Sequence, residues 1–241
     1  MNGHRLIERQ LRHWNRMTAV LKRTPAGKSL AEVTKRPVLT VSGTVGSGRE
    51  RLAKALCKEL EYELFGRELL DAVASDLHCR RMLLDSLDER VQSNLEVMFE
   101  SLIHGREFEN QDYIHSLVRG IGSLAEKGGA VILGRCGASV VGKQAALRIL
   151  VEASVPVRVR RLIEWRQISE SEARHYVETH DQEQKKFCRY YFHCDICNPL
   201  NYDLMINTDR TEPEDAVKIV LAALAARGIK ISKPELQHAE R

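Results

Sequence analysis

From Pro37 onward, the chain alternates short runs typical of β-strands with longer helical stretches, and this alternation limits the folds that it can adopt. Five runs have the composition of strands: PVLTVSG, YELFG, GGAVILG, ALRILVEA and YDLMINT. Stretches with helical spacing of apolar residues separate these runs. Strands joined by helical crossovers run parallel. The sequence therefore predicts an α/β fold with a doubly wound, five-stranded parallel sheet, in which ligands bind beyond the carboxyl ends of the strands.

The first 36 residues differ from the rest in charge. They hold nine Lys and Arg residues and two Glu residues, so nine minus two gives a charge of +7. Apolar residues at helical spacing predict an amphipathic helix over about 4–22, and the following RTPAGKS stretch is a linker. We interpret the helix as docked on the body, and we expect no nucleic-acid partner. The alternatives are a homo-oligomer or protein contact through this helix, and contact of its positive charge with an anionic membrane surface.

These features divide the chain into three parts. Residues 1–36 form the basic helix and linker, and residues 37–228 form the α/β domain. Within that domain we expect a helical lid over about 158–192, where a long arginine-rich stretch has no strand signal. Residues 229–241 are expected to form a C-terminal tail.

The chain contains no apolar run approaching the roughly 20 residues that span a bilayer. Its first residues are charged throughout and lack the apolar stretch of a signal peptide. We therefore expect a cytoplasmic protein without a membrane span, whose six cysteines are reduced thiols. We interpret the stretch HCDIC as incidental, and expect no metal ligands. The alternative is a metal site formed by Cys194, Cys197 and His193, with Cys188 as the nearest candidate for a further ligand.

A glycine-rich turn, GTVGSGRE, joins the first predicted strand to the helix that follows it. In this context glycines let the backbone N–H groups converge on an anion, and the start of the helix adds a favourable field. Arg49 occupies the lysine position of a phosphate-binding loop and supplies a cation, whereas Glu50 replaces the usual hydroxyl residue. The residues expected to contact the phosphates of a nucleotide are Gly43, Gly46, Ser47, Gly48, Arg49 and Glu50.

A single arginine and an arginine-rich pair of helices are also expected near the same end of the sheet. Arg135 directly follows the third strand in VILGRCG, where its guanidinium group can bind a phosphate. The stretch from 156 to 192 predicts two helices that meet around Ser169, with arginines and carboxylates interleaved. Such a pair can close over phosphates and neutralise charge during phosphoryl transfer, although solvated helix faces carry the same pattern.

Taken together, these pieces resemble the cytidylate kinase-like family, a P-loop branch related to nucleoside monophosphate kinases. The resemblance rests on the glycine loop, YELFGRELL, VILGRCGA, the arginine-rich helical pair with Asp181, and YDLMINT, in that order and at similar spacing. It covers residues 38 to about 225 and does not cover residues 1–36.

The resemblance implies that ATP with Mg²⁺ binds the loop at 43–49 and that an acceptor nucleotide binds between the sheet and the helices after residue 66. It assigns Arg67 and Arg135 to the acceptor. We expect four catalytic residues. Arg49 lies on the donor side, and the other three belong to the lid: Arg161, Arg174 and Asp181.

Three departures from the family pattern reduce charge or metal-binding capacity. The loop reads GSGRER where relatives commonly read GSGGRE. Gly66 stands where an aspartate usually precedes the arginine matching Arg67, and Gln184 stands where an arginine often follows the lid aspartate. Each of these changes bears on turnover more than on the fold.

Three functional hypotheses follow. The first is a phosphotransferase that moves the γ-phosphoryl group of ATP to a nucleoside monophosphate, with CMP or dCMP as acceptor. The second is a catalytically impaired nucleotide-binding regulatory protein, which the three departures favour. The third is a small-molecule kinase with a different acceptor, because the glycine loop is common to all of these proteins.

Overall fold

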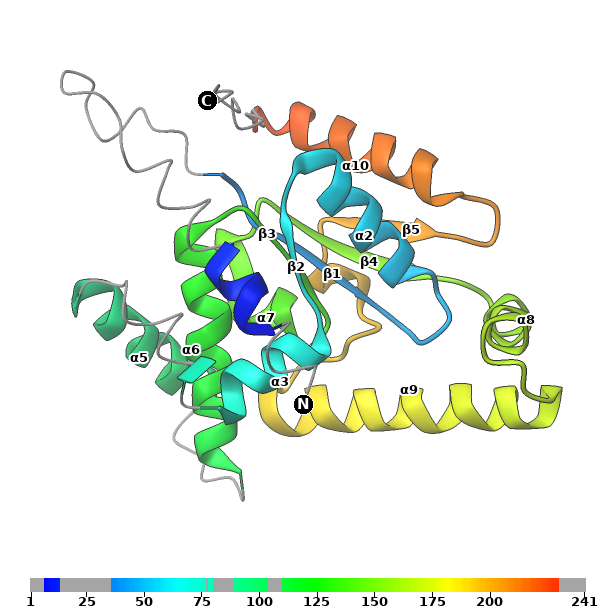
Figure 1. Ribbon diagram of the computed structural model, residues 1–241, viewed down its shortest axis with the longest axis horizontal. Helices are drawn as coiled ribbons and strands as arrows, with labels where there is room; N and C mark the ends of the chain where they lie inside the picture. The colour runs from blue at the N-terminus through cyan, green and yellow to red at the C-terminus, as the bar shows by residue number, and fades with distance from the viewer. Residues whose placement is uncertain (1–6, 14–35, 77, 80–88, 104–109, 230–241) are drawn as a thin grey trace.

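The structure of the protein, a computed structural model, describes residues 7–13, 36–76, 78–79, 89–103 and 110–229 (Figure 1). The linker that follows the N-terminal helix and almost all of the C-terminal tail therefore lie outside the described residues. Within the described part of the chain, no helix is long and apolar enough to cross a membrane.

A single five-stranded parallel sheet forms the centre of the domain, as the sequence predicts. Its strands are β1 (Leu39–Gly43), β2 (Glu63–Phe65), β3 (Ala130–Leu133), β4 (Leu147–Glu152) and β5 (Leu204–Asn207). The strand order is β2-β3-β1-β4-β5, and every neighbouring pair runs parallel. The order reverses at β1, so the turn after β1 lies at the switch point where open α/β sheets bind ligands.

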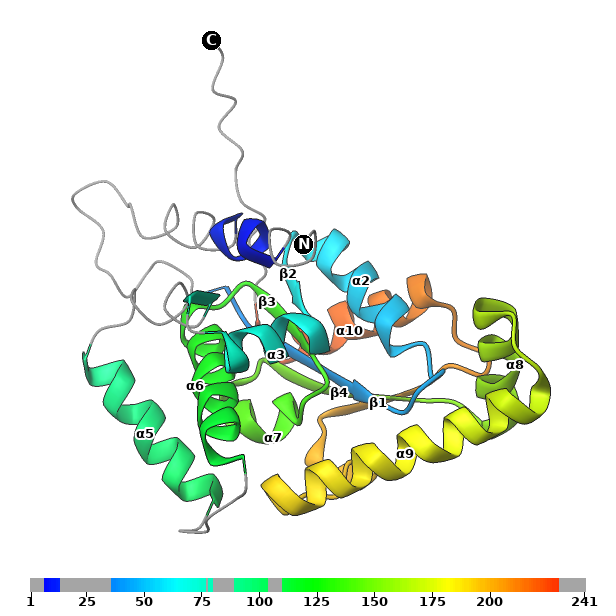
Figure 2. The ribbon, with the colours of Figure 1, turned by 60° about the horizontal axis from the view of Figure 1, so that its bottom comes forward.

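Helices cover both faces of this sheet (Figures 1 and 2). One face carries α2 (Arg49–Leu60) and α10 (Pro213–Ala226). The other face carries α3 (Arg67–Ser75), α6 (Gln111–Lys127) and the short α7 (Gly137–Val141). A sixth segment, α5, packs on the outer side of α6 and spans Glu89–Ile103.

The alternation of side chains along each strand explains why both faces are covered. In β3, Val131 packs with α2 and α10, whereas Ile132 packs with the helices on the opposite face. Both residues are fully buried. A parallel strand buried on both faces reads as a continuous apolar run, which is the pattern of AVIL in the sequence.

The predicted lid is a pair of helices, α8 (Val155–Arg166) and α9 (Glu170–Phe192). The chain reverses where Gln167 adopts a left-handed conformation, and Ser169 begins α9 with a reciprocal capping box to Glu172. A small apolar cluster holds the two helices together, and Val45 of the glycine loop packs against it. The lid is therefore seated on the turn after β1 (Figure 2).

Two short 3₁₀ helices complete the elements of the described chain. They span Gly142–Gln144, before β4, and Pro199–Asn201, before β5. Both lie in connections between longer elements and contribute no residue to the apolar core clusters.

The N-terminal helix packs on the domain in its described portion. Residues 7–13 are helical, Leu11 is fully buried among the side chains of the α3 and α6 face, and the Gln10 side chain donates to the Leu64 carbonyl at 2.7 Å. That bond joins the N-terminal helix to β2, a strand at the edge of the sheet. The structure thus confirms a docked amphipathic helix over 7–13, while the remainder predicted over 4–22 lies outside the described residues.

Candidate active site

The glycine loop has the backbone conformation of a phosphate-binding turn. Gly43, Gly46 and Gly48 have φ angles of +154°, +77° and +84°. A Cβ atom at Gly43 would lie 2.2 Å from the carbonyl oxygen of Val151, so no larger residue fits there. The turn delivers the chain to the start of α2 at Arg49, whose first-turn N–H groups have no acceptor within the helix. The geometry matches an anion site at a helix N-terminus.

Three guanidinium groups lie against the carbonyl oxygens of this loop. Arg49 folds back and donates to the carbonyl of Gly43. Arg158, on α8, donates through Nε to the Val45 carbonyl at 2.7 Å. Arg161, one turn further along α8, donates to the Gly46 carbonyl at 3.2 Å. The loop is therefore lined with three cations, each of which donates to a carbonyl oxygen of its backbone.

Arg161 also reaches the end of β5, through Thr208. Its two terminal nitrogens donate to the Thr208 hydroxyl at 2.9 Å and to the Thr208 carbonyl at 2.7 Å. The same hydroxyl donates to the Ser47 carbonyl at 2.6 Å. Thr208 thus links the lid, the last strand and the glycine loop. From the sequence, Thr208 is expected in the loop beside the nucleotide base, although a core strand and its turn explain most of YDLMINT.

Burial distinguishes Arg49 from an ordinary surface arginine. Desolvation lowers the pKa of its guanidinium group, and the nearby carboxylates of Glu50, Asp181 and Glu152 act in the opposite direction. The group nevertheless stays charged, since an arginine pKa exceeds neutral pH by several units. A phosphate entering the loop would therefore meet a cation already stripped of much of its water.

Two carboxylates stand beside these arginines. Asp181, on α9, accepts two hydrogen bonds of 2.7 Å from one terminal nitrogen of Arg158. Glu152, at the end of β4, accepts from the Thr44 hydroxyl at 2.9 Å. Burial raises the pKa of Glu152, and the charges of Arg158 and Arg49 only partly offset this effect. Glu152 was not recognised from the sequence, because a carboxylate at a strand end has no distinctive local signal.

Two polar atoms at this edge are buried without a hydrogen-bond partner among the described residues. They are the Ser47 hydroxyl oxygen and the Oε1 atom of Glu152. Hydroxyl and carboxylate oxygens are ligands that Mg²⁺ prefers, and a loop of free N–H groups suits a phosphate. The residues present therefore fit ATP with Mg²⁺.

Arg67 and Arg135, the two residues predicted for the acceptor, both lie beside the Asp71 carboxylate, which was not recognised from the sequence. Arg135 forms a forked pair with Asp71, with its Nε 2.7 Å from Oδ1 and its Nη2 2.5 Å from Oδ2. Arg67 Nε lies 3.7 Å from Asp71 Oδ2. The Tyr113 hydroxyl donates to the same carboxylate at 2.6 Å. The four-residue spacing of Arg67 and Asp71 on a helix was the available signal.

Arg135 has an unusual backbone conformation, and Asp71 determines much of the electrostatics of this arginine group. Arg135 is held in a left-handed conformation, with φ of +48°, in the turn after β3. Desolvation alone would raise the pKa of Asp71, but the hydrogen bonds from Arg135 and Tyr113 outweigh it, so the pKa lies below its ordinary value. Asp71 is consequently ionised at neutral pH and balances part of the positive charge.

Helix α9 connects the two sides. The Gln184 side chain donates to the Gly43 carbonyl at 3.3 Å, and the Phe187 ring lies 5.1 Å from the guanidinium carbon of Arg135. Since these residues are one turn apart on the same helix, a movement of α9 changes both sides at once.

The remaining two predicted site residues lie outside this group of contacts. Arg174 pairs with Glu170 at 3.0 Å on the exposed surface of α9. Glu50 is exposed in the first turn of α2. Their roles in catalysis and in nucleotide binding remain predictions.

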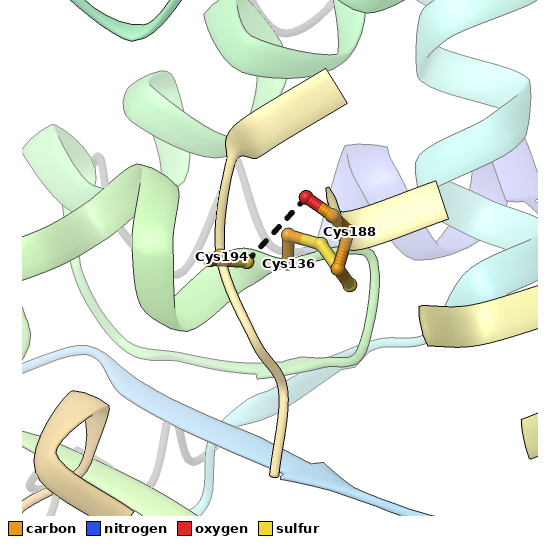
Figure 3. A group of neighbouring side chains, drawn as sticks. All are labelled: Cys136, Cys188 and Cys194. Carbon is orange, nitrogen blue, oxygen red and sulfur yellow. Dashed lines mark hydrogen bonds between the residues drawn. A yellow bond between two sulfur atoms is a disulfide. The ribbon is translucent and has the colours of Figure 1, made fainter. Parts of the chain in front are cut away.

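The cysteines require a correction. Cys136 and Cys188 are joined by a disulfide, so the prediction that all six cysteines are reduced thiols is wrong for this pair (Figure 3). The sulfur that lies beside them belongs to Cys194, whereas the free thiol of Cys197 is exposed and belongs to no such cluster in the described chain. This cluster differs from the alternative grouping of Cys194 and Cys197, because Cys136 is 52 residues from Cys188 in the sequence and only the fold brings them together.

Comparison with known proteins agrees with this geometry. A family model described as the cytidylate kinase-like family matches residues 38–210. A cytidylate kinase from Pyrococcus horikoshii is 30% identical over 191 residues, which are 78% of this chain and 88% of the relative. A cytidylate kinase from Halobacterium salinarum is 25% identical over 190 residues, covering 78% of this chain and 90% of the relative.

A solved structure supports the fold. The crystal structure of an uncharacterized protein from Eubacterium ventriosum aligns with a TM-score of 0.57 and 17% identity. The alignment covers 80% of this chain and 100% of that chain. At this identity the likeness concerns the fold alone.

Proposed function

The chain belongs to the cytidylate kinase-like family, and from this premise we propose that it transfers the γ-phosphoryl group of ATP to a nucleoside monophosphate, with CMP or dCMP as acceptor. The single observation that carries the proposal is the presence of two separate arginine groups at one edge of the sheet, joined by α9. Phosphoryl transfer between two nucleotides needs two such groups, because both substrates bring phosphates to one place.

The donor nucleotide is assigned to the glycine loop. Backbone N–H groups of the loop and of the first turn of α2 would hold the phosphates, with Arg49 and Arg161 turning from the loop carbonyls to the phosphate oxygens. Beside the loop, Gly48, Arg161, Thr208 and Pro213 line a hollow where α2 approaches α10. The hollow has a volume of about 10 Å³, which is room for about one water and not for a nucleoside.

The acceptor is assigned to the group formed by Arg67, Arg135 and Asp71. A monophosphate binding there would compete with the Asp71 carboxylate for the forked donors of Arg135. This competition lowers the affinity for the phosphate alone and leaves more of the selectivity to the rest of the nucleotide. Tyr113, already bonded to Asp71, would keep the carboxylate in place when Arg135 moves.

Catalysis would consist of positioning and charge neutralisation. Arg158 and Asp181 fix α8 to α9, so the lid presents Arg161 over the loop at a set angle. As the phosphoryl group leaves ATP, negative charge grows on the oxygens between the two sites, where the arginines are most effective. Bound Mg²⁺ would neutralise phosphate oxygens, and Ser47 and Glu152 are the residues we assign to hold it, directly or through water.

A coupled assay of ADP formation tests this proposal. Wild-type protein is given ATP, Mg²⁺ and CMP, dCMP, UMP, AMP or GMP in turn. We expect the highest kcat/KM with CMP or dCMP, and a loss of about 100-fold or more in Arg161→Ala. Failure of every acceptor to give ADP above the Arg161→Ala control would contradict it.

A second candidate is nucleotide binding without turnover, as in a regulatory protein. One observation favours it. Arg49 stands at the lysine position of a phosphate-binding loop, and its guanidinium group donates to the Gly43 carbonyl. The discriminating measurement is the unfolding temperature with ATP. A saturable rise in Tm with no ADP formed from any acceptor would favour this candidate over the kinase.

We further propose that the protein acts in the cytoplasm, where nucleoside monophosphates and ATP are both available. Fractionation of cells followed by immunoblotting of the native protein tests this, and recovery in a membrane fraction would contradict it.

A further inference from the structure

Three cysteine sulfurs gather beside the acceptor group of arginines. The sulfurs of Cys136, Cys188 and Cys194 lie within 4.8 Å of one another (Figure 3). Cys136 and Cys188 are joined by the disulfide, with their Cα atoms 6.1 Å apart. Cys194 is a free thiol, and its sulfur lies 3.7 Å from the Cys188 carbonyl oxygen. A disulfide with a third sulfur at this separation has the parts needed for exchange.

The three cysteines differ in their access to solvent. Cys136 and Cys188 are 6% and 2% exposed, so a reagent in solution cannot readily reach either sulfur of the bond. Cys194 is partly exposed and lies two residues after the end of α9. Cys194 is therefore the member of the cluster through which an external thiol or disulfide would act.

The disulfide also lies at a sensitive place. Cys136 directly follows Arg135 in the turn after β3, and Cys188 directly follows Phe187, the ring packed against Arg135. The bond thus ties α9 to the turn that presents the acceptor arginine. Helix α9 also contacts the glycine loop through Gln184, so the bond restrains the helix shared by both sides.

We propose that Cys136, Cys188 and Cys194 form a thiol–disulfide exchange site for low-molecular-weight thiols, in which Cys194 passes electrons to the buried Cys136–Cys188 bond and thereby sets the position of Arg135. The site is distinct from the nucleotide contacts, because none of the three sulfurs takes part in the arginine and carboxylate network.

The reaction balances with thiol reductant alone. The Cys194 thiolate attacks one sulfur of the Cys136–Cys188 bond, forms a new disulfide with it, and releases the other cysteine as a thiolate. An external thiolate then attacks Cys194 and frees the second buried cysteine, leaving a mixed disulfide on Cys194. A second external thiolate releases Cys194 and forms the external disulfide. Two external thiols are oxidised, two protein thiols are formed, and the protons of the external thiols go to the released cysteines.

Kinetics of reduction test the role of Cys194. Oxidised protein is treated with glutathione or dithiothreitol, samples are alkylated over time, and the Cys136–Cys188 peptide is followed by mass spectrometry. Burial raises the pKa of the Cys194 thiol, so the reaction is followed over hours. We expect Cys194→Ser to slow reduction by about tenfold or more, because an intramolecular attack is replaced by an external one. Cys197→Ser, which removes an exposed cysteine three residues away, is the matched control and should reduce at the wild-type rate.

Two results would overturn the proposal. One is reduction at the same rate in wild type and Cys194→Ser. The other is a metal site in place of exchange: reduced protein that binds one equivalent of Zn²⁺ through these cysteines, with the Co²⁺-substituted form showing a thiolate charge-transfer band that Cys194→Ser abolishes.

The effect of the disulfide on Arg135 rests on the proposed function, and a separate experiment tests it. We expect reduction to change KM for the acceptor by about threefold or more while KM for ATP changes less. We expect the Cys136→Ala/Cys194→Ser double variant, which leaves Cys188 without a partner from this cluster, to show the reduced-state values in either buffer. Alanine suits the buried position of Cys136 because a free cysteine behaves as a small apolar residue. Equal KM values in the oxidised and reduced wild type would overturn the coupling. If the protein transfers no phosphoryl group, the reduction kinetics remain measurable, so the two failures are distinguishable.

Discussion

The donor and acceptor sides of the candidate site use the same residue types in different electrostatic arrangements. On the donor side, Arg49 and Arg158 donate to carbonyl oxygens of the loop, Arg158 is also paired with Asp181, and the nearby Glu152 keeps one oxygen unpartnered within the described structure. On the acceptor side, Asp71 accepts from Arg135 and Tyr113 and is paired with Arg67. The pKa of Glu152 is consequently raised by burial, whereas hydrogen bonds lower that of Asp71 against the effect of burial.

This difference indicates that only the donor side is arranged for added positive charge. An unpartnered, partly buried carboxylate beside a phosphate loop is stabilised by a cation, which is how Mg²⁺–ATP would arrive. On the acceptor side, Asp71 already balances part of the positive charge, and a ligand must displace an existing ion pair. Four substitutions, ordered from the largest expected effect to the smallest, sharpen or break this contrast.

Gly43→Ala should have the largest effect, because the donor loop has no room for a side chain. The new Cβ would overlap the Val151 carbonyl at 2.2 Å, and we expect a loss of about 2–4 kcal/mol in the free energy of unfolding, measured with urea. Gly66→Ala is the matched control before α3, since a Cβ there meets nothing within 4 Å. A change below about 1 kcal/mol in Gly43→Ala would show that the loop relaxes freely.

Asp71→Asn should destabilise the protein through the acceptor side. The amide keeps the shape but loses the charge that holds Arg135, and we expect a loss of about 1–3 kcal/mol at pH 7. Because the pKa of Asp71 is lowered on folding, its contribution is present above the ordinary value of 3.8 and is lost as pH falls through the folded value. The difference between wild type and variant should therefore shrink at low pH. A difference that persists unchanged below pH 3 would refute the ion-pair explanation.

Glu152→Gln should raise the free energy of unfolding, whereas Asp71→Asn should lower it. Without bound nucleotide, removal of a desolvated charge should stabilise the protein by about 1 kcal/mol or less at pH 8. The pKa of Glu152 is raised on folding, so stability falls as pH rises from the ordinary value of 4.5 through the folded value. The advantage of the variant should accordingly grow with pH over that window. Destabilisation by Glu152→Gln at every pH would mean that Glu152 is already well paired.

Arg174→Ala should have the smallest effect. Its recorded ion pair is with Glu170 on an exposed face of α9, and such pairs contribute about 0.5 kcal/mol or less. We expect unchanged unfolding and a kcat within about twofold of wild type, with Arg161→Ala as the comparison. A tenfold or greater loss of kcat would instead support the catalytic role that the family resemblance assigns to Arg174.

The sheet could be predicted from the sequence because its strands are buried on both faces. A run such as AVIL has no polar alternation, and glycines at 128, 129 and 134 bound it. The loop was equally clear, since its glycines lie between a strand and a helix. The helix pair of the lid followed from the spacing of its charges and from the Ser169 start.

The contacts of the site were less predictable because they join distant parts of the chain. Asp71 and Arg135 are 64 residues apart, and Thr208 is 161 residues from Ser47. Neither Asp71 nor Thr208 is unusual in its local segment, so only the packed fold identifies its partner. The disulfide between Cys136 and Cys188 was missed for the same reason, with 52 residues between its ends.

The central claim is that Arg161 serves the donor nucleotide and Arg135 serves the acceptor. Steady-state KM values for ATP and CMP, measured in wild type, Arg161→Ala and Arg135→Ala, test it most directly. We predict that Arg135→Ala raises KM for CMP about tenfold or more with KM for ATP within about twofold, and that Arg161→Ala does the reverse. Equal increases in both KM values in each variant would contradict the claim.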